Sequence, residues 1–294
     1  MNPRDLAVYA ILAVVWGFSF MLVVRVVPAF GWAGTVSFRA LTAGGALLLI
    51  ALLMRRKLDF SCGWGPLFLS GFLTVAMQLG GIAFAAPRIG TAMTAIIVAA
   101  IPLFSMVVGR IAGLERLSQR SMAGLLLGFA GIVMLVGFPD HAITAEFLFA
   151  CGISIIGSLS AACGSLYVST RLHRVDPWVV TIGSFLAGGL ITLPLLAVVP
   201  VPVVPDAADY LWLLVLGLVT SALMYVLFFG LLASIGPTRA ISVEFAVTVV
   251  AVIAGTLLLG ERLSPVQIAG AAVIVTGCML VLGLWPGGFR RRTG

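Results

Sequence analysis

Residues 115–124 read ERLSQRSMAG, and residues 261–270, which lie 146 positions further on, read ERLSPVQIAG. Chance similarity in an apolar chain produces matches of Leu, Val and Ala, whereas this match contains a Glu-Arg-Leu-Ser run with two charges. The same offset relates further residues along most of the chain: Arg25 and Arg171, Trp32 and Trp178, Gly71 and Gly217, Thr74 and Thr220, Gly90 and Gly236, Gly109 and Gly255, and Gly131 and Gly277. One constant offset predicts an internal duplication, with a first repeat over residues 1–142 and a second over residues 143–294.

The chain that carries these repeats is unusually apolar. Hydrophobic residues make up 62% of its 294 residues and charged residues only 9%, whereas about 25% of an average soluble domain is charged. A globule in water could not bury so many apolar side chains in one core, so this composition requires an apolar solvent. It excludes a soluble enzyme, a disordered chain and a secreted disulfide scaffold.

Ten apolar runs are each long enough to cross a bilayer as a helix, which takes about 20 residues. The runs are continuous rather than alternating, which predicts helices and not strands. The predicted spans cover residues 6–27, 34–54, 64–86, 90–111, 119–137, 146–169, 177–199, 209–233, 238–259 and 265–285. We therefore expect an all-α polytopic membrane protein with ten transmembrane helices. Five spans per repeat make an odd number, so the second repeat is inverted relative to the first.

The distribution of Lys and Arg predicts the orientation of the chain in the membrane. With a cytoplasmic N-terminus, thirteen basic residues lie in the inner connections, and only Arg25, Arg88 and Arg262 lie in the outer ones. Both termini are therefore expected on the cytoplasmic side of the cytoplasmic (inner) membrane. Because the basic residues follow the inner face, the net charge of +7 needs no nucleic acid partner. The expected partners are the lipid bilayer and a small-molecule substrate.

Several motifs resemble those of the drug/metabolite transporter superfamily, EamA type. They are Trp16-Gly17-x-Ser19-Phe20 in the first span, Phe38-Arg39 at the start of the second, and the duplicated Glu-Arg-Leu-Ser followed by a glycine-rich last span. The resemblance covers essentially the whole chain and extends to amino-acid and metabolite exporters, including aromatic amino-acid exporters. It implies a five-plus-five inverted fold in which the fifth and tenth spans are peripheral and the others enclose a central cavity.

Five residues are candidates for binding a substrate in such a cavity. Trp16, Ser19 and Phe20 share one helix face at spacings of three and four, and Trp16 lies near the middle of its span rather than at an interface. Gln78 and Tyr225 could line the cavity from opposite halves. Each of the five could instead serve helix packing or an interhelical hydrogen bond.

Arg39 and Glu244 are the strong charges that fall clearly inside predicted spans. A charge in hydrocarbon costs at least a few kcal/mol, so each is expected to face a cavity or a partner. Arg39 could anchor backbone carbonyls or a loop, whereas Glu244 could couple protons or bind an ammonium group. Pro102 is expected to kink the fourth span and to act in gating. The repeat-equivalent residue is Thr248, which argues against strictly symmetric gating.

Other chemistries find little support in the sequence. There is no P-loop, no G-x-S-x-G and no H-E-x-x-H motif, and both histidines lie in connections, so we expect no enzyme. The four cysteines form no metal-ligand pattern, so neither a metal nor another cofactor is expected. Gly124 and Gly128 form a G-x-x-x-G motif that could serve a weak homodimer or packing within a monomer.

These observations predict a secondary transporter that exports small metabolites by alternating access through a central cavity. Amino acids, including aromatic and neutral ones, are the favoured substrates: a zwitterion needs partners for both charges and an apolar wall for its side chain. The alternative is proton-coupled efflux of lipophilic drugs or dyes, with Glu244 as the coupling residue. Doubly anionic cargo is disfavoured, because Arg39 is the one basic residue expected inside a span.

Overall fold

The computed structural model describes residues 2–114, 118–136, 144–250 and 265–282. Within these ranges every element of secondary structure is a helix and none is a strand. The elements are α1 Pro3–Leu53, α2 Trp64–Gly71, the π-helix η1 Phe72–Met77, α3 Gln78–Val98, α4 Ile101–Ile111, α5 Gln119–Val136, α6 Ala145–Arg171, α7 Pro177–Thr192, the 3₁₀-helix η2 Leu193–Ala197, α8 Ala207–Gly217, the π-helix η3 Leu218–Leu223, α9 Met224–Ile235, α10 Pro237–Ile241 and α12 Pro265–Leu282. Residues 243–250 form a further helix.

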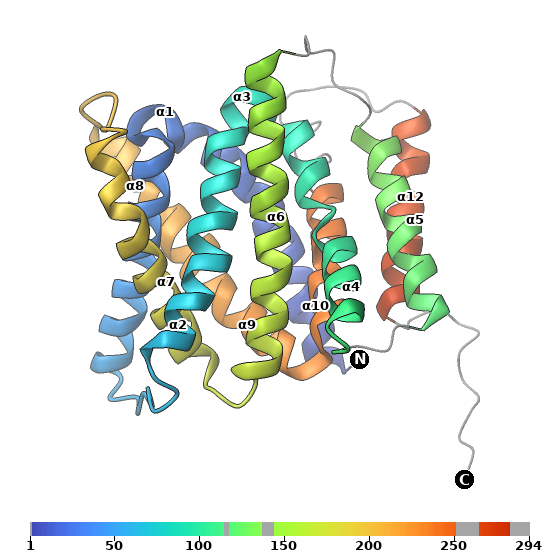
Figure 1. The fold of residues 1–294 in the computed structure, drawn as a ribbon, viewed down its shortest axis with the longest axis horizontal. Helices are drawn as coiled ribbons and strands as arrows, with labels where there is room; N and C mark the ends of the chain where they lie inside the picture. Colours follow the sequence, from blue (N-terminus) through green and yellow to red (C-terminus); the bar gives the residue numbers. More distant parts are fainter. Residues whose placement is uncertain (1, 115–117, 137–143, 251–264, 283–294) are drawn as a thin grey trace.

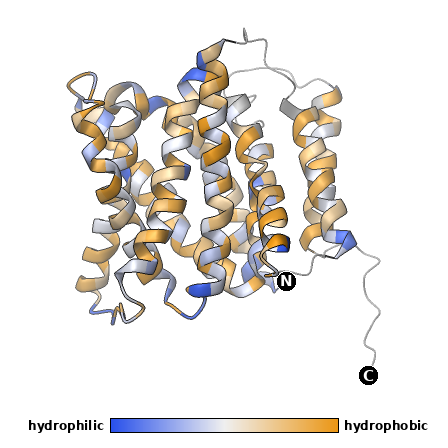
Figure 2. Cartoon of the chain, in the orientation of Figure 1, coloured by the Kyte–Doolittle hydropathy of each residue, from blue (hydrophilic) through white to orange (hydrophobic). Residues whose placement is uncertain are grey.

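Among the described residues, five helical stretches are long and apolar enough to cross a membrane: Pro3–Leu53, Trp64–Gly90, Ala145–Arg171, Pro177–Ala197 and Ala207–Ile235. Shorter apolar helices lie at Ile101–Ile111, Gln119–Met134 and Ile268–Leu282. Hydrophobic residues run along the helices, and most hydrophilic ones lie at their ends (Figure 2). The prediction of an all-helical chain is thus confirmed where the structure describes it. The count of ten spans stays a prediction, because parts of spans 238–259 and 265–285 lie outside these residues.

Glycines with a positive φ separate consecutive predicted spans. Spans 6–27 and 34–54 fall together in α1, whose helical backbone is interrupted at Gly31 with φ 68°. Spans 64–86 and 90–111 meet inside α3 at Gly90, where φ is 80°. A residue without a Cβ adopts such angles readily, so these glycines allow the chain to change direction without a long loop.

Predicted span 90–111 is broken directly before Pro102, and the role of Pro102 in gating stays a prediction. α3 ends at Val98 and α4 begins at Ile101, so Pro102 lies in the first turn of α4 rather than inside a continuous helix. In a first turn the missing N–H removes no bond within α4 itself. Pro102 therefore begins a helix after a break, and the Val98 carbonyl lacks its usual partner four residues on.

The backbone repeats its irregularities at the offset seen in the sequence. The π-helices at residues 72–77 and 218–223 are 146 positions apart, and Gly90 and Gly236 have φ values of 80° and 81°. Side-chain bonds repeat as well: Thr74 donates to the Ser70 carbonyl at 2.8 Å, and Thr220 donates to the Leu216 carbonyl at 2.7 Å. The two halves of the sequence therefore form the same local structure.

The halves are interlocked crosswise. The part of α1 after Gly31 packs on α8 and η3, and α7 packs on α2 and η1. In each contact a glycine permits close approach: a Cβ on Gly71 would lie 2.3 Å from the Ser184 carbonyl oxygen, and one on Gly217 would lie 3.3 Å from the Arg39 carbonyl oxygen. The second predicted span of each half thus contacts the third of the other half.

α5 and α12 form a pair at one edge of the bundle (Figure 1), which is the peripheral place that the resemblance implies for spans five and ten. Their backbones meet at small residues, since a Cβ on Gly124 would lie 2.8 Å from the Gly277 carbonyl oxygen. A Cβ on Gly128 would lie 2.5 Å from the Phe245 ring. Both glycines of the G-x-x-x-G motif therefore pack against this same chain.

Gly71→Ala should lower the free energy of unfolding by about 1–3 kcal/mol, the usual cost of overpacking, because the new methyl group would clash with the backbone of α7. Gly45→Ala is the control, since no heavy atom lies within 4 Å of its Cβ position. Thermal unfolding of the purified variants in detergent measures both. An unchanged Tm for Gly71→Ala would contradict the close approach of α2 and α7.

Candidate functional site

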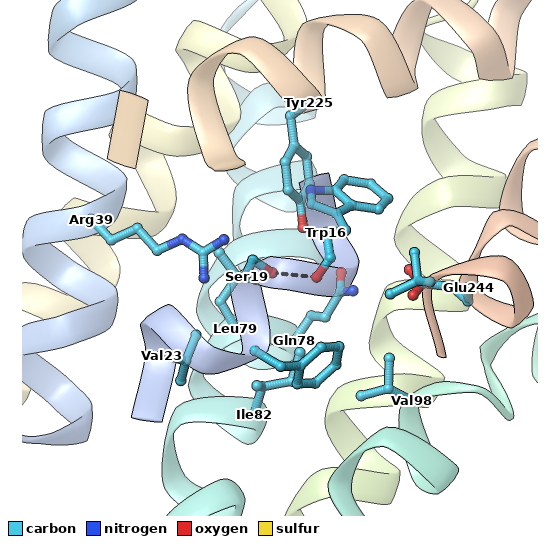
Figure 3. A pocket seen from close by; sticks show the side chains of 12 residues that line it. Trp16, Ser19, Val23, Arg39, Gln78, Leu79, Ile82, Val98, Tyr225 and Glu244 are labelled. Carbon is cyan, nitrogen blue, oxygen red and sulfur yellow. Dashed lines mark hydrogen bonds between the residues drawn. The ribbon is translucent and has the colours of Figure 1, made fainter. Parts of the chain in front are cut away.

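A cavity lies among helices of both halves. The seven residues predicted for substrate binding and charge all line it: Trp16, Ser19, Phe20, Arg39, Gln78, Tyr225 and Glu244. Val23, Leu79, Ile82, Val98 and Val247 complete its lining (Figure 3). The structure thus brings all seven to one place. Pro102 is not among the lining residues of the described chain, but Val98, the last residue of α3 before the break, is one of them.

Two pairs of lining residues are related by the repeat offset of 146. Leu79 corresponds to Tyr225, and Val98 corresponds to Glu244. Equivalent positions of the two halves therefore face the same cavity, as expected where two related halves meet. In each pair the first half supplies an aliphatic residue and the second half a residue with a polar group.

Arg39 is held by the second half of the chain. It is only 6% exposed, its Nε donates to Ser221 Oγ at 2.5 Å, and one terminal nitrogen donates to Thr220 Oγ1 at 3.2 Å. The sequence suggested an anchor for backbone carbonyls or a loop, but the partners are two hydroxyls of the π-helix η3. Arg39 is both anchored and part of the cavity wall.

Trp16 is fixed by a backbone acceptor and by rings. Its Nε1–H donates to the Thr220 carbonyl at 3.0 Å, and its ring lies 5.4 Å from the Tyr225 ring and 5.2 Å from the Phe228 ring, between centroids. The indole N–H is therefore committed to the protein, which leaves the ring for an apolar ligand surface. Ser19 likewise donates its hydroxyl hydrogen to the Trp16 carbonyl at 2.8 Å, so its oxygen can only accept.

Glu244 lies on the helix at residues 243–250 and is 9% exposed. Within the described chain no hydrogen bond or ion pair reaches its carboxylate, and the three ion pairs found there involve neither Glu244 nor Arg39. In Figure 3, Arg39 and Glu244 lie on opposite sides of the pocket, with Trp16, Ser19 and Gln78 between them. One basic and one acidic side chain thus face the same cavity without bonding to each other.

Two contacts join the first part of α1 to the second half between the cavity and the start of the helix. Tyr9, about two helical turns before Trp16, has its hydroxyl 3.1 Å from Ser242 Oγ and is 5% exposed. One turn further, Ser234 donates to the Asp5 carboxylate at 3.0 Å.

Sequence reasoning missed the residues that support the site, chiefly Thr220, Ser221, Phe185 and Phe228. Phe185 packs edge-on against Tyr225 with ring centroids 4.8 Å apart. Apolar and small hydroxyl residues are common in membrane helices, so their type alone does not distinguish them. Thr220 was visible as the repeat partner of Thr74, but nothing in its spacing linked it to Arg39.

The chain is similar to known transporters over nearly its full length. The model of the EamA-like transporter family matches residues 6–137 and again residues 148–283. The uncharacterized inner membrane transporter YedA of Escherichia coli (strain K12) is 28% identical over 278 residues, which cover 92% of this chain and 88% of YedA. A probable amino-acid metabolite efflux pump of Salmonella typhimurium (strain LT2) is 24% identical over 298 residues, which cover 94% of each chain.

Protein PecM of Dickeya dadantii (strain 3937) is 27% identical over 288 residues, which cover 96% of this chain and 92% of PecM. A solved crystal structure of a protein that is 19% identical superposes with a TM-score of 0.76 and covers 97% of this chain and 98% of that one. At that identity the superposition shows a shared fold.

Trp16→Phe should lower the free energy of unfolding by about 1–3 kcal/mol, because it keeps a ring but loses the buried hydrogen bond to the Thr220 carbonyl. Trp64→Phe, at a side chain that is 51% exposed, is the control and should change stability little. Thermal unfolding in detergent compares the two. Equal effects would mean that the indole hydrogen bond does not hold Trp16 in place.

Proposed function

The chain belongs to the EamA-like transporter family, and from this premise we propose that it exports small zwitterionic metabolites, amino acids above all, across the inner membrane. One observation carries the proposal. A guanidinium and a carboxylate line the same aromatic cavity without pairing with each other. Two unlike charges at separate places in an apolar wall are complementary to a solute that carries both charges itself.

The chemistry of an amino acid fits this arrangement group by group. The Arg39 guanidinium can receive the α-carboxylate through charge-assisted hydrogen bonds, which are stronger than neutral ones. Glu244 can receive the ammonium group, with the Val98 carbonyl that Pro102 leaves without a donor as a second acceptor. Trp16, Phe20 and Tyr225 offer rings to the substrate side chain, and the Gln78 amide can donate or accept between the two ends.

Alternating access fits the interlocked halves and the broken helices. The proposed topology has ten spans in two inverted repeats with both termini in the cytoplasm, so the end closed by Tyr9 and Ser242 is the cytoplasmic one. Gly90 and the break between Val98 and Ile101 are places where the chain can bend, and this assigns gating to the segment that holds Pro102. Breaking the Tyr9–Ser242 and Asp5–Ser234 contacts would open the cavity to the cytoplasm.

Counterflow into liposomes tests the substrate class. Vesicles loaded with unlabelled phenylalanine or threonine should accumulate the labelled amino acid without an ion gradient. Arg39→Gln and Glu244→Gln should each weaken apparent affinity about 10- to 100-fold, since a hydrogen bond to a charged group is worth about 1.5–3 kcal/mol. Glu146→Gln is the control, because the Glu146 side chain is 73% exposed. Wild-type counterflow no greater than that of empty liposomes would reject the proposal.

A second function is favoured by the unpaired carboxylate of Glu244, which could bind a lipophilic cation or a proton in turn. Proton-coupled efflux predicts that a pH gradient drives a lipophilic cation out of wild-type vesicles and that Glu244→Gln abolishes this flux. Arg39→Gln should then leave the flux intact, since a cation needs no guanidinium. Loss of amino-acid counterflow in both variants, without any cation flux in the wild type, would exclude this alternative.

A further inference from the structure

We infer that Ser221 is a positioning residue that, together with Thr220, aims Arg39 into the cavity and so sets the preference for solutes with a carboxylate. The inference rests on the proposed function and names the residues that would make the transporter specific for carboxylates. It follows from three features: the direction of the hydrogen bonds, the edge of the guanidinium that remains open, and a comparison between the two halves.

The hydroxyls of η3 can only accept from Arg39. Thr220 Oγ1 donates to the Leu216 carbonyl at 2.7 Å, and Ser221 Oγ donates to the same carbonyl at 3.0 Å. A hydroxyl has one hydrogen, so both oxygens present only lone pairs to the guanidinium. The wide turn of a π-helix lets residues four and five positions after Leu216 share its carbonyl, which places two acceptors side by side.

These two acceptors occupy one edge of the guanidinium and leave the other open. Nε and one terminal nitrogen make the bonds to Ser221 and Thr220. The guanidinium has five N–H donors in a rigid fork, so three remain, and two of these lie on the edge formed by the two terminal nitrogens. Arg39 lines the cavity, and its guanidinium points into it beside Ser19 (Figure 3). A free edge of this kind binds a carboxylate through two parallel hydrogen bonds.

The first half contains the equivalent π-helix without an arginine facing it. Its π-helix η1 keeps Thr74, the counterpart of Thr220, with the same bond to a carbonyl four residues earlier. The counterpart of Ser221 is Val75, and the counterpart of Arg39 is Phe185, which is fully buried. A π-helix therefore forms with valine at this position, so the fold does not require the Ser221 hydroxyl. The hydroxyl occurs in the half whose facing residue is an arginine.

The comparison supplies a matched set of variants. Ser221→Val introduces the residue found at the equivalent position of the first half, Val75, and removes the acceptor. Ser221→Thr introduces a side chain of nearly the same shape as valine but keeps the hydroxyl. Ser70→Ala is the control for loss of a buried hydroxyl contact between the halves, since Ser184 donates to Ser70 Oγ at 2.8 Å outside the cavity.

The readout is competition against labelled phenylalanine counterflow by phenylalanine and by phenylalanine amide, which lacks the carboxylate. Ser221→Val should weaken competition by phenylalanine about tenfold and leave competition by the amide unchanged, whereas Ser221→Thr and Ser70→Ala should keep the wild-type ratio. A structural role would weaken both competitors together, so an unchanged ratio in Ser221→Val overturns the inference.

A second measurement needs no solute and separates failure of the inference from failure of the proposed function. Phenylglyoxal modifies arginines, and mass spectrometry of the digested protein follows its reaction at Arg39. Modification should be several-fold faster in Ser221→Val than in wild type, Ser221→Thr or Ser70→Ala, because the guanidinium loses its anchor. Equal rates overturn the anchoring by Ser221. Faster modification in a protein that shows no phenylalanine counterflow supports the anchoring and rejects the proposed substrate.

Discussion

A guanidinium cannot lie in an apolar interior unless hydrogen-bond acceptors surround it, and in this chain the acceptors for Arg39 come from the other half of the molecule. The bonds to Thr220 and Ser221 join the second predicted span to the π-helix η3. The Trp16 indole donates to the carbonyl of Thr220 as well. One irregular turn of helix thus holds the charge and an aromatic wall of the cavity, and the geometry of the site depends on it.

The duplication gives the two halves the same backbone structure, and a few differences in side chains make the two sides of the cavity unequal. Leu79 and Val98 face the cavity from the first half, where their counterparts in the second half are Tyr225 and Glu244. Phe185 stands opposite η1 as a buried ring, where Arg39 stands opposite η3 as a buried charge. The repeated backbone preserves packing, while the side chains at equivalent places give the cavity one basic residue, one acidic residue and an apolar remainder.

The two charges also limit what the cavity can hold. Under the proposed function, a solute that carries both charges bonds to both Arg39 and Glu244, so it is held more favourably than one that bonds to only one of them. In the proposed function the contacts of Tyr9 and Asp5 with the second half control access to the cavity. Selectivity and access are then provided by different residues.

Much of the architecture was predictable because the bilayer acts on composition. Apolar length, the offset of 146 and the distribution of charges indicated helical spans, duplication and orientation without any contact information. Seven candidate residues could be named because polar, charged and central aromatic residues are rare in membrane helices, and the structure places all seven around one cavity. Gly90 and Gly236 were visible as a repeat pair, although their positive φ angles were not.

Tertiary structure alone decided how these residues are used. Whether Arg39 and Glu244 face one cavity depends on the crosswise packing of the halves, which no local pattern encodes. The role proposed for Ser221 depends on a π-helix that brings its hydroxyl beside that of Thr220. The place of Pro102 in the first turn of α4 depends on where the preceding helix ends. Hydropathy and spacing are properties of residues near one another in the sequence, whereas the hydrogen bonds of the site join residues far apart in it. The sequence therefore determined which residues could line a site, and the packing determined what each of them contacts.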